Sequence, residues 1–147
     1  MNEKILLDKD YAFVDYNAEQ KLGRIIWKRE PDASEYKIAY LTMLNFASAE
    51  DMRYLLSDIR DQGSGLPNER KWFEQELLPA INKTRLKKAA VVYDGTFSKK
   101  YYVNLIIAAG KKFGLSIKLF ENEENAVSWL VSTSEEKEIT EKTVKVL

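Results

Sequence analysis

The chain has 147 residues, of which 45% are apolar, six are glycines and three are prolines, a composition typical of one globular domain. Cys and His are both absent, which excludes thiolate nucleophiles, imidazole bases and the zinc or haem sites built from these residues. The 23 basic residues balance the 23 acidic residues, so the net charge predicts no general attraction to nucleic acid or anionic membranes.

The N-terminal part predicts three β-strands, at residues 4–7, 11–16 and 21–28. The connectors between these runs have hairpin length and contain turn-forming residues, so we expect an antiparallel meander. The first apolar run is too short for a signal peptide or a membrane span, and no later stretch reaches the length of a spanning helix. We therefore expect a cytoplasmic protein without membrane insertion.

After residue 30 the hydrophobic pattern changes to a helical period. Asp32 or Ser34 can cap a helix, and Glu35 follows Asp32 at the spacing of a capping box. The apolar side chains of this helix recur on one face: Tyr36, Tyr40, Met43, Leu44 and Ala47. Residues 52–59 follow as a strand that is apolar in its centre, as in a parallel sheet covered on both faces.

A loop at residues 60–67 leads into a second helix. The stripe predicted to be buried on this helix consists of Phe73, Leu77, Ala80 and Ile81. Pro79 lies inside the stripe and lacks a backbone donor, so we expect the helix to kink or loosen in its last turn. Residues 88–94 form the next buried strand.

A third helix places apolar residues at successive i+4 positions, a pattern that predicts a core-facing stripe: Phe97, Tyr101, Leu105, Ala109 and Phe113. Gly114 ends this helix, and residues 115–120 form the last strand. Asn122 caps a final helix whose first turn carries Glu123 and Glu124, as the helix dipole favours. The order of elements predicts an α/β fold with a single mixed sheet, in which an N-terminal antiparallel hairpin or meander precedes βα repeats.

The pattern predicts one domain at residues 1–131 and a charged C-terminal tail at residues 132–147. Tails of this composition usually fray. The apolar residues Val144, Val146 and Leu147 nevertheless indicate that the tail packs, either as an added edge strand or against a neighbouring chain.

Several segments are similar to those of a known family. They are the strand end at residues 55–60, the helix that runs from Pro67 to Pro79, the strand at residues 89–93 and the closing segment at residues 120–130. The closing segment is an acidic turn followed by an Ala-x-x-Trp-Leu motif. Together with the order of elements, these segments resemble the SpoIIAA-like (STAS-type) family of small bacterial domains, from about Leu7 to the end of the last helix.

The resemblance implies a regulatory role. Anti-sigma-factor antagonists of this superfamily are regulated by phosphorylation of a Ser in an Asp-Ser-Ser-Gly turn at a helix N-terminus. The corresponding residue here is Ser64, which is followed by Gly65 and Leu66, but Gln62 and Gly63 stand where the family has the acid and the first Ser. Ser64 is therefore either a candidate phosphorylation site or an ordinary residue of an exposed turn.

Two acids end strands that we expect to be parallel neighbours. Asp58 and Asp94 should lie at the carboxyl edge of the sheet, where open α/β sheets bind ligands. They could hold a cation or accept a phosphoryl group, or each could cap the turn that follows its strand. A receiver-type site also needs a further acidic pair and a partner Lys, which the sequence does not place, so we expect no metal site and no cofactor.

The charges are unevenly distributed along the chain. Residues 83–118 contain nine bases and one acid, a local charge of +8. Thr96, Ser98, Lys99 and Lys100 gather at the start of the third helix, which could form a surface for anions or for an acidic protein. The alternative is a solvated helix face balanced by nearby acids. Glycine-rich phosphate motifs and aromatic-basic interleaving are absent, so we expect no nucleic-acid binding.

Trp72 lies one residue from the inward stripe of the second helix, so we expect it at the rim, beside the 63–67 loop. With no nucleophile and base pair in the sequence, we expect a non-catalytic regulatory or interaction module that binds a protein partner through the surface around the Gln62-to-Trp72 loop and helix. A homodimer is compatible with this role. The alternative is a small anionic or amphipathic ligand at the strand carboxyl-end cleft. The candidate surface consists of Asp58, Ser64, Trp72, Asp94, Thr96, Lys99 and Lys100.

Overall fold

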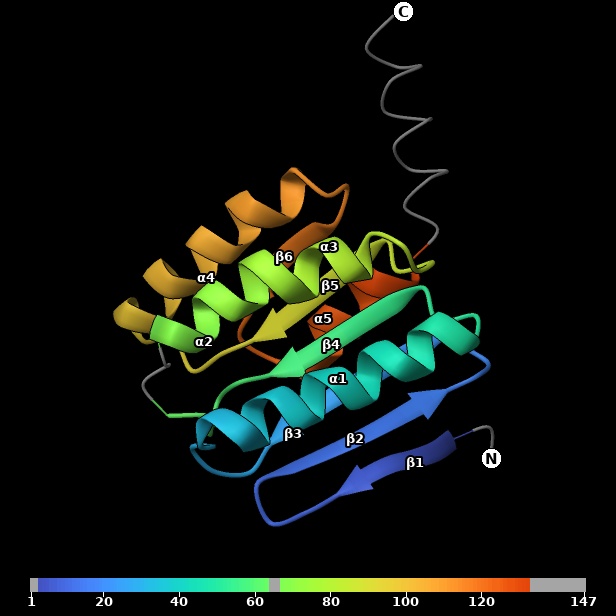
Figure 1. The fold of residues 1–147 in the computed structure, drawn as a ribbon, viewed down its shortest axis with the longest axis horizontal. Coiled ribbons are helices and arrows are strands. Elements are labelled where there is room, and N and C mark those ends of the chain that lie inside the picture. Colours follow the sequence, from blue (N-terminus) through green and yellow to red (C-terminus); the bar gives the residue numbers. More distant parts are fainter. Residues whose placement is uncertain (1–2, 64–66, 133–147) are drawn as a thin grey trace, which may run out of the picture.

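A computed structural model describes residues 3–63 and 67–132 of the chain. The predictions made for Ser64, and those for the tail at residues 133–147, lie outside the described residues. Across the described residues, the chain forms one six-stranded sheet with helices on both faces (Figure 1). In the same ranges, no helix has the length and apolar character needed to cross a membrane.

The sheet is mixed, as the order of elements predicts, and its strands follow one another in sequence order from edge to edge. The first two pairings, β1 with β2 and β2 with β3, are antiparallel, and the remaining three are parallel. The strands are β1 (Glu3–Asp8), β2 (Ala12–Asn17), β3 (Leu22–Trp27), β4 (Tyr54–Asp58), β5 (Lys88–Val92) and β6 (Ser116–Phe120).

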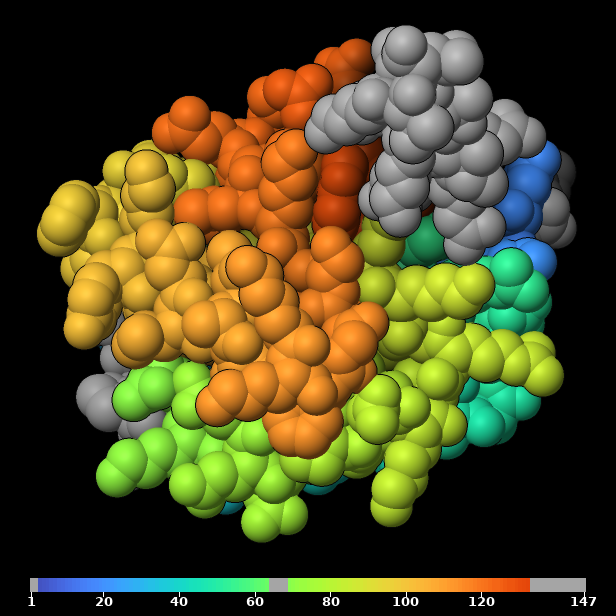
Figure 2. All heavy atoms as spheres, turned by 90° about the horizontal axis from the view of Figure 1, so that it is seen from above, coloured from blue at the N-terminus to red at the C-terminus, as the bar shows by residue number. Residues whose placement is uncertain are grey.

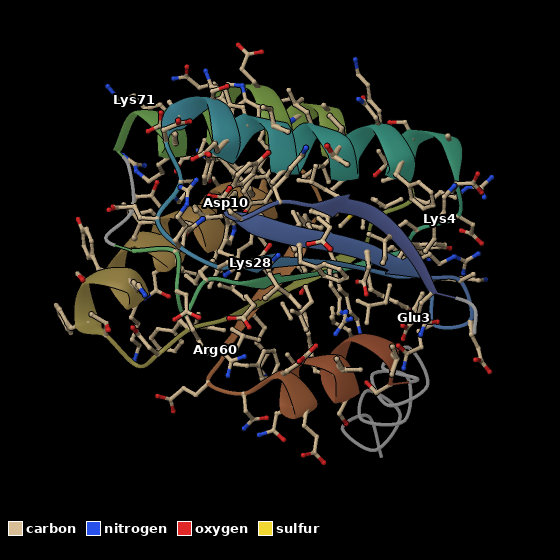
Figure 3. The ribbon with its side chains drawn as sticks, turned by 90° about the horizontal axis from the view of Figure 1, so that it is seen from below. Glu3, Lys4, Asp10, Lys28, Arg60 and Lys71 are labelled. Atoms are coloured by element: carbon tan, nitrogen blue, oxygen red, sulfur yellow. The ribbon has the colours of Figure 1, made fainter. Side chains whose placement is uncertain are left out.

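The connections between the parallel strands place their helices on one face of the sheet. Right-handed crossovers that advance one strand at a time in one direction require this arrangement. These helices are α1 (Ala33–Ala49), α2 (Pro67–Trp72), the π-helical turn η1 (Phe73–Leu77), α3 (Leu78–Ile81) and α4 (Phe97–Lys111). The last helix, α5 (Glu123–Val131), follows β6 and packs on the opposite face, against β4, β5 and β6 (Figure 3).

Two hydrophobic clusters form the core, one on each face of the sheet. The larger cluster lies under α1, η1 and α4, where Trp27 stacks on Tyr36 with 5.8 Å between the ring centroids. The smaller cluster lies under α5 and contains Leu56, Val92 and Leu130. The alternation of side chains along β4 and β5 therefore supplies apolar residues to both faces, as expected for buried parallel strands.

Two local predictions are confirmed. Asp32, not Ser34, caps α1: its carboxylate accepts from the backbone N–H of Glu35 at 2.8 Å, while the backbone N–H of Asp32 donates to Glu35 at 3.0 Å. The expected loosening near Pro79 is also present, but it lies before the last turn and not in it: residues 73–77 form the π-helical turn η1, in which the N–H of Leu78 donates to the carbonyl of Phe73, and the last turn is the α-helical α3. Pro79 cannot donate a backbone bond and its ring crowds the preceding turn, which accounts for the wider turn.

The predicted core-facing stripe of α4 is wrong at its start. Phe97 and Tyr101 are 83% and 64% exposed, and the helix buries Val103, Ile106 and Gly110 instead. Each i+4 step advances about 40° around a helix, so five residues in such a series drift by about 160° and cannot all face the sheet. The segment therefore presents its two N-terminal aromatic residues to solvent.

Candidate functional site

Lys99 connects two of the loops at the carboxyl edge of the sheet. Its ammonium group donates to the carbonyl oxygens of Ile59 at 3.2 Å and Arg60 at 3.0 Å, and lies 3.0 Å from Oδ2 of Asp94. Only 12% of the Lys99 side chain is exposed. The structure therefore gives this predicted surface cation an internal role: it fixes the first turn of α4 against the end of β4.

Asp94 organises the turn between β5 and α4. Its Oδ1 atom accepts hydrogen bonds from the backbone N–H of Thr96 at 3.0 Å and from the Thr96 hydroxyl at 2.5 Å. These two bonds, followed by that from Lys99, hold the pKa of the Asp94 carboxyl far below its usual value. Gly95 between them has a φ of +84°, which favours glycine. Asp94 and Thr96 thus act as a turn cap, the second of the two roles that the sequence left open.

Asp58 belongs to the other face of the sheet. It lies between Ile26 of β3 and Val92 of β5 in the strand register, and it is 5% exposed. Arg60 binds both of its carboxylate oxygens, at 2.9 Å and 2.6 Å, and lies on the α5 side of the strands (Figure 3). Asp58 and Asp94 therefore follow neighbouring strands, as predicted, but each has its own cation. No group of three or more acids within the described ranges could hold a metal ion.

An ion cluster around the buried Asp15, on the α5 side of the sheet, was not predicted. Asp15 of β2 is 4% exposed, and Arg24 of β3 binds its two oxygens at 2.9 Å and 2.6 Å. The same guanidinium donates to Glu123 in the first turn of α5 at 2.7 Å, and hydrogen bonding to Asp15 raises the pKa of Arg24. The hairpin register could have paired Asp15 with Arg24, but nothing in the sequence links Glu123 to them.

Trp72 is half-buried between α2 and α1. The Trp72 ring meets the Tyr36 ring edge-on, with 6.0 Å between the two centroids. The ammonium group of Lys37 lies 5.7 Å from the centroid of the Trp72 ring. The half-buried state of Trp72 agrees with the expected position at the rim of the helix. The ring is nevertheless already packed against Tyr36 and Lys37, which leaves less of it for a partner.

The outer face of α4 combines aromatic and basic side chains. We define the α4 face as the exposed residues Phe97, Lys100, Tyr101, Lys111 and Lys112. The helix contains no acidic residue. Its three exposed lysines form no ion pair within the part of the chain that the structure describes. Figure 2 views the molecule from this side, where the side chains of α4, coloured gold to orange, form the left part of the surface.

An open cleft adjoins the α4 face at the carboxyl ends of β5 and β6. It encloses about 390 Å³ between the first turns of α4 and α5. Tyr93 and Phe120 supply apolar walls, and Lys100 and Glu121 supply one charge of each sign. Of the predicted site residues, Lys100 alone lines this cleft among the described residues. The structure brings Asp94, Thr96 and Lys99 together, and leaves Asp58 and Trp72 apart from them.

Comparisons of the chain with protein-family models, curated proteins and solved structures find no match. The acids at the carboxyl edge are held by cations and by turn hydrogen bonds, an arrangement that stabilises the loops. The α4 face, in contrast, has apolar and charged groups that remain available to another molecule.

Proposed function

We propose that the chain is a non-catalytic interaction module that binds an acidic protein through the α4 face. The observation that carries the proposal is the exposure of Phe97 and Tyr101, one helical turn apart, at 83% and 64%. Burying a large apolar side chain stabilises a complex by about 1.5–3 kcal/mol. Tyr and other aromatic residues at the centre of an interface supply a large share of its affinity.

The charge of the α4 face favours an acidic partner. Lys100 lies next to the aromatic pair, Lys111 and Lys112 lie at the C-terminal end of the same helix, and no acid on the helix offsets them. A second copy of the same face would bring like charges together, which costs free energy in a self-complementary dimer. An acidic partner would gain from the same lysines in its rate of association and in its orientation.

The α4 face is also held in place before any partner arrives. Lys99 ties the first turn of α4 to the end of β4, and Asp94 and Thr96 fix the preceding turn. A surface that is already ordered loses less conformational entropy on binding. The cleft beside Lys100 offers a recess of about 390 Å³ for a side chain of the partner.

Membership of the SpoIIAA-like (STAS-type) class is part of the proposal. Its support is the order of elements, in which antiparallel strands precede parallel strands that alternate with helices. A regulatory module of this kind would act by occupying or releasing a partner, and it needs no catalytic group. In this proposal the protein acts by binding through the α4 face.

Photo-crosslinking tests the proposal. The crosslinking amino acid p-benzoylphenylalanine replaces Phe97 in one full-length sample and Ile38, an exposed residue of α1, in a matched sample. Both samples are irradiated in a lysate of the native host, and adducts are identified by mass spectrometry. The proposal predicts an adduct with one acidic protein from position 97, and none with that protein from position 38.

Two controls make the outcome specific. The paired changes Lys111→Glu and Lys112→Glu should weaken the adduct from position 97, and so should raising the salt concentration to about 0.5 M, where surface charges are screened. An adduct with a basic protein or with nucleic acid, or the same adducts from both positions, would show that the α4 face is not the docking surface.

A further inference from the structure

A second candidate site lies inside the molecule, between the sheet and the helix layer. A cavity of about 50 Å³ lies there between β4, β5, β6, α1, η1 and α4. This volume exceeds the roughly 10–15 Å³ that one water needs and is about a third of an engineered cavity that binds benzene. The space is therefore large enough for a molecule of a few heavy atoms.

The strand residues that line the cavity are apolar near the amino ends of the strands and include a polar residue nearer the carboxyl edge. Leu55, Ala89 and Ile117 are neighbours in the register of β4, β5 and β6, and form an apolar row near the amino ends. Ser57 lies two residues after Leu55, on the same face and nearer the carboxyl edge. A hydroxyl group thus follows an aliphatic row, where the other floor positions are apolar.

The helices above the sheet add further polar groups to the lining. Tyr36 and Tyr40 of α1 line the same cavity with 4.9 Å between their ring centroids, and Ser57 lies close to the side chain of Tyr40. Tyr102 of α4 joins them from the opposite wall. The ring of Trp27 packs against both tyrosines, which places its buried indole N–H close to the Tyr40 side chain. Polar groups therefore gather toward one end of the cavity.

Among the residues that the structure describes, none of those lining the cavity has a charged side chain. A charged ligand would lose its hydration there without gaining an ion partner, which is strongly unfavourable. An uncharged molecule with one polar group can instead place that group among the hydroxyls and its hydrocarbon against the apolar row. The composition of the lining thus selects for a neutral amphipathic ligand.

Two further features of the lining favour ligand binding. Gln62 and Tyr102 are half-buried, so the polar end of the lining reaches the surface between β4 and α4. Phe73, the first residue of η1, forms part of the wall. Single π-helical turns inside helices are frequent at functional sites, and this one lies directly over the cavity.

We propose that this cavity is a binding site for a small uncharged amphipathic molecule, with its hydroxyl or carbonyl group at Tyr36, Tyr40 and Ser57 and its hydrocarbon at Leu55, Ala89 and Ile117. The inner side of α4 lines the cavity and its outer side forms the α4 face, so this site is separate from the protein-binding surface. The two proposals can therefore succeed or fail independently.

Two probes of different polarity test the site by NMR. Butan-1-ol has a polar group and a short hydrocarbon, whereas xenon has no polar group. We expect both to shift the backbone amide signals of β4, β5 and α4 with saturation. Ser57→Ala should weaken butan-1-ol binding about fivefold, as expected for one lost hydrogen bond, and leave xenon binding unchanged. Ser48→Ala removes an exposed hydroxyl of α1 and is the matched control.

Ala89→Leu fills the apolar row and should remove binding of both probes; Ala89→Val is the milder version if the first variant does not fold. Shifts by butan-1-ol that never saturate, or binding that survives in the filled variants, would overturn the proposal. Binding of xenon alone would show an apolar void without a polar subsite, and would also overturn it.

Discussion

The ammonium group of Lys99 lies 3.0 Å from Oδ2 of Asp94, and it is shared with two backbone carbonyl oxygens at the end of β4. One side chain of α4 therefore joins two loops that are far apart in sequence. Because the aromatic residues Phe97 and Tyr101 flank Lys99 in the sequence, this contact also fixes the position of the proposed docking surface.

Replacing Lys99 by Met should lower the free energy of unfolding by about 1–3 kcal/mol, because the carbonyl oxygens and the carboxylate lose a charged donor. Lys100→Met is the matched control: its side chain is exposed and forms no ion pair within the described ranges. It should change stability by less than about 0.5 kcal/mol. Urea unfolding of both variants measures the difference. Equal losses would contradict the internal role of Lys99.

The Asp94 carboxyl makes the stability of the fold depend on pH in the acidic range. Its pKa is lower in the folded chain than the ordinary value of 3.8, so the unfolded chain binds the proton more readily and folding is favoured at higher pH. The contribution of Asp94 is complete above its unfolded pKa and is lost as the pH falls toward its folded pKa. We expect wild type to melt above Asp94→Asn at neutral pH, and the gap to narrow below about pH 4. A gap that is constant down to about pH 2 would argue against this origin.

Arg24 compensates a buried acid. Arg24→Met should destabilise the fold by about 3–5 kcal/mol, because Asp15 would remain buried without its cation. Adding Asp15→Asn to that variant removes the uncompensated charge and should restore much of the stability. Glu123→Gln should cost less than about 1 kcal/mol, since Glu123 is partly exposed. The test is chemical denaturation of the four proteins; an unimproved double variant would contradict it.

Gly110 brings α4 close to β6. A Cβ atom there would lie 2.7 Å from Cδ1 of Ile117, so Gly110→Ala should destabilise the protein by about 1–3 kcal/mol, despite the better helix propensity of Ala. Ile117→Val removes the atom that is in the way. In that background Gly110→Ala should cost less than it does in wild type, as measured by thermal unfolding. The same cost in both backgrounds would rule out this contact as the cause.

The sequence predicts the fold well because its signals are local. Hairpin connectors, the capping box at Asp32 and alternating apolar runs each depend on neighbouring residues, and together they predict a single mixed sheet with βα repeats. The order of the strands in the sheet comes from the structure. The π-helical turn also has a local cause in Pro79. The stripe on α4 failed because an i+4 series does not hold one direction along a helix.

The candidate site was harder to predict because it depends on distant contacts. Asp58 and Asp94 follow adjacent strands, as the pattern indicates. Each of them forms an ion pair, Asp58 with Arg60 and Asp94 with Lys99, and these ion pairs hold the loops at the end of the sheet. The cavity depends on how Tyr36, Ser57 and Tyr102 come together from three elements. The spacing of residues within one segment of the chain does not show which side chains of different elements meet in the fold.

Two matched double variants test the central claim most directly, once the acidic partner captured at position 97 has been purified. Phe97→Ser with Tyr101→Ser removes the aromatic pair of the α4 face, and Ile38→Ser with Leu41→Ser removes an exposed apolar pair of α1. Binding to the partner is measured by isothermal titration calorimetry. We predict a loss of affinity of at least about tenfold for the first variant and less than about twofold for the second. Unchanged affinity for the first variant, or equal losses for both, would contradict the assignment of the α4 face as the docking surface.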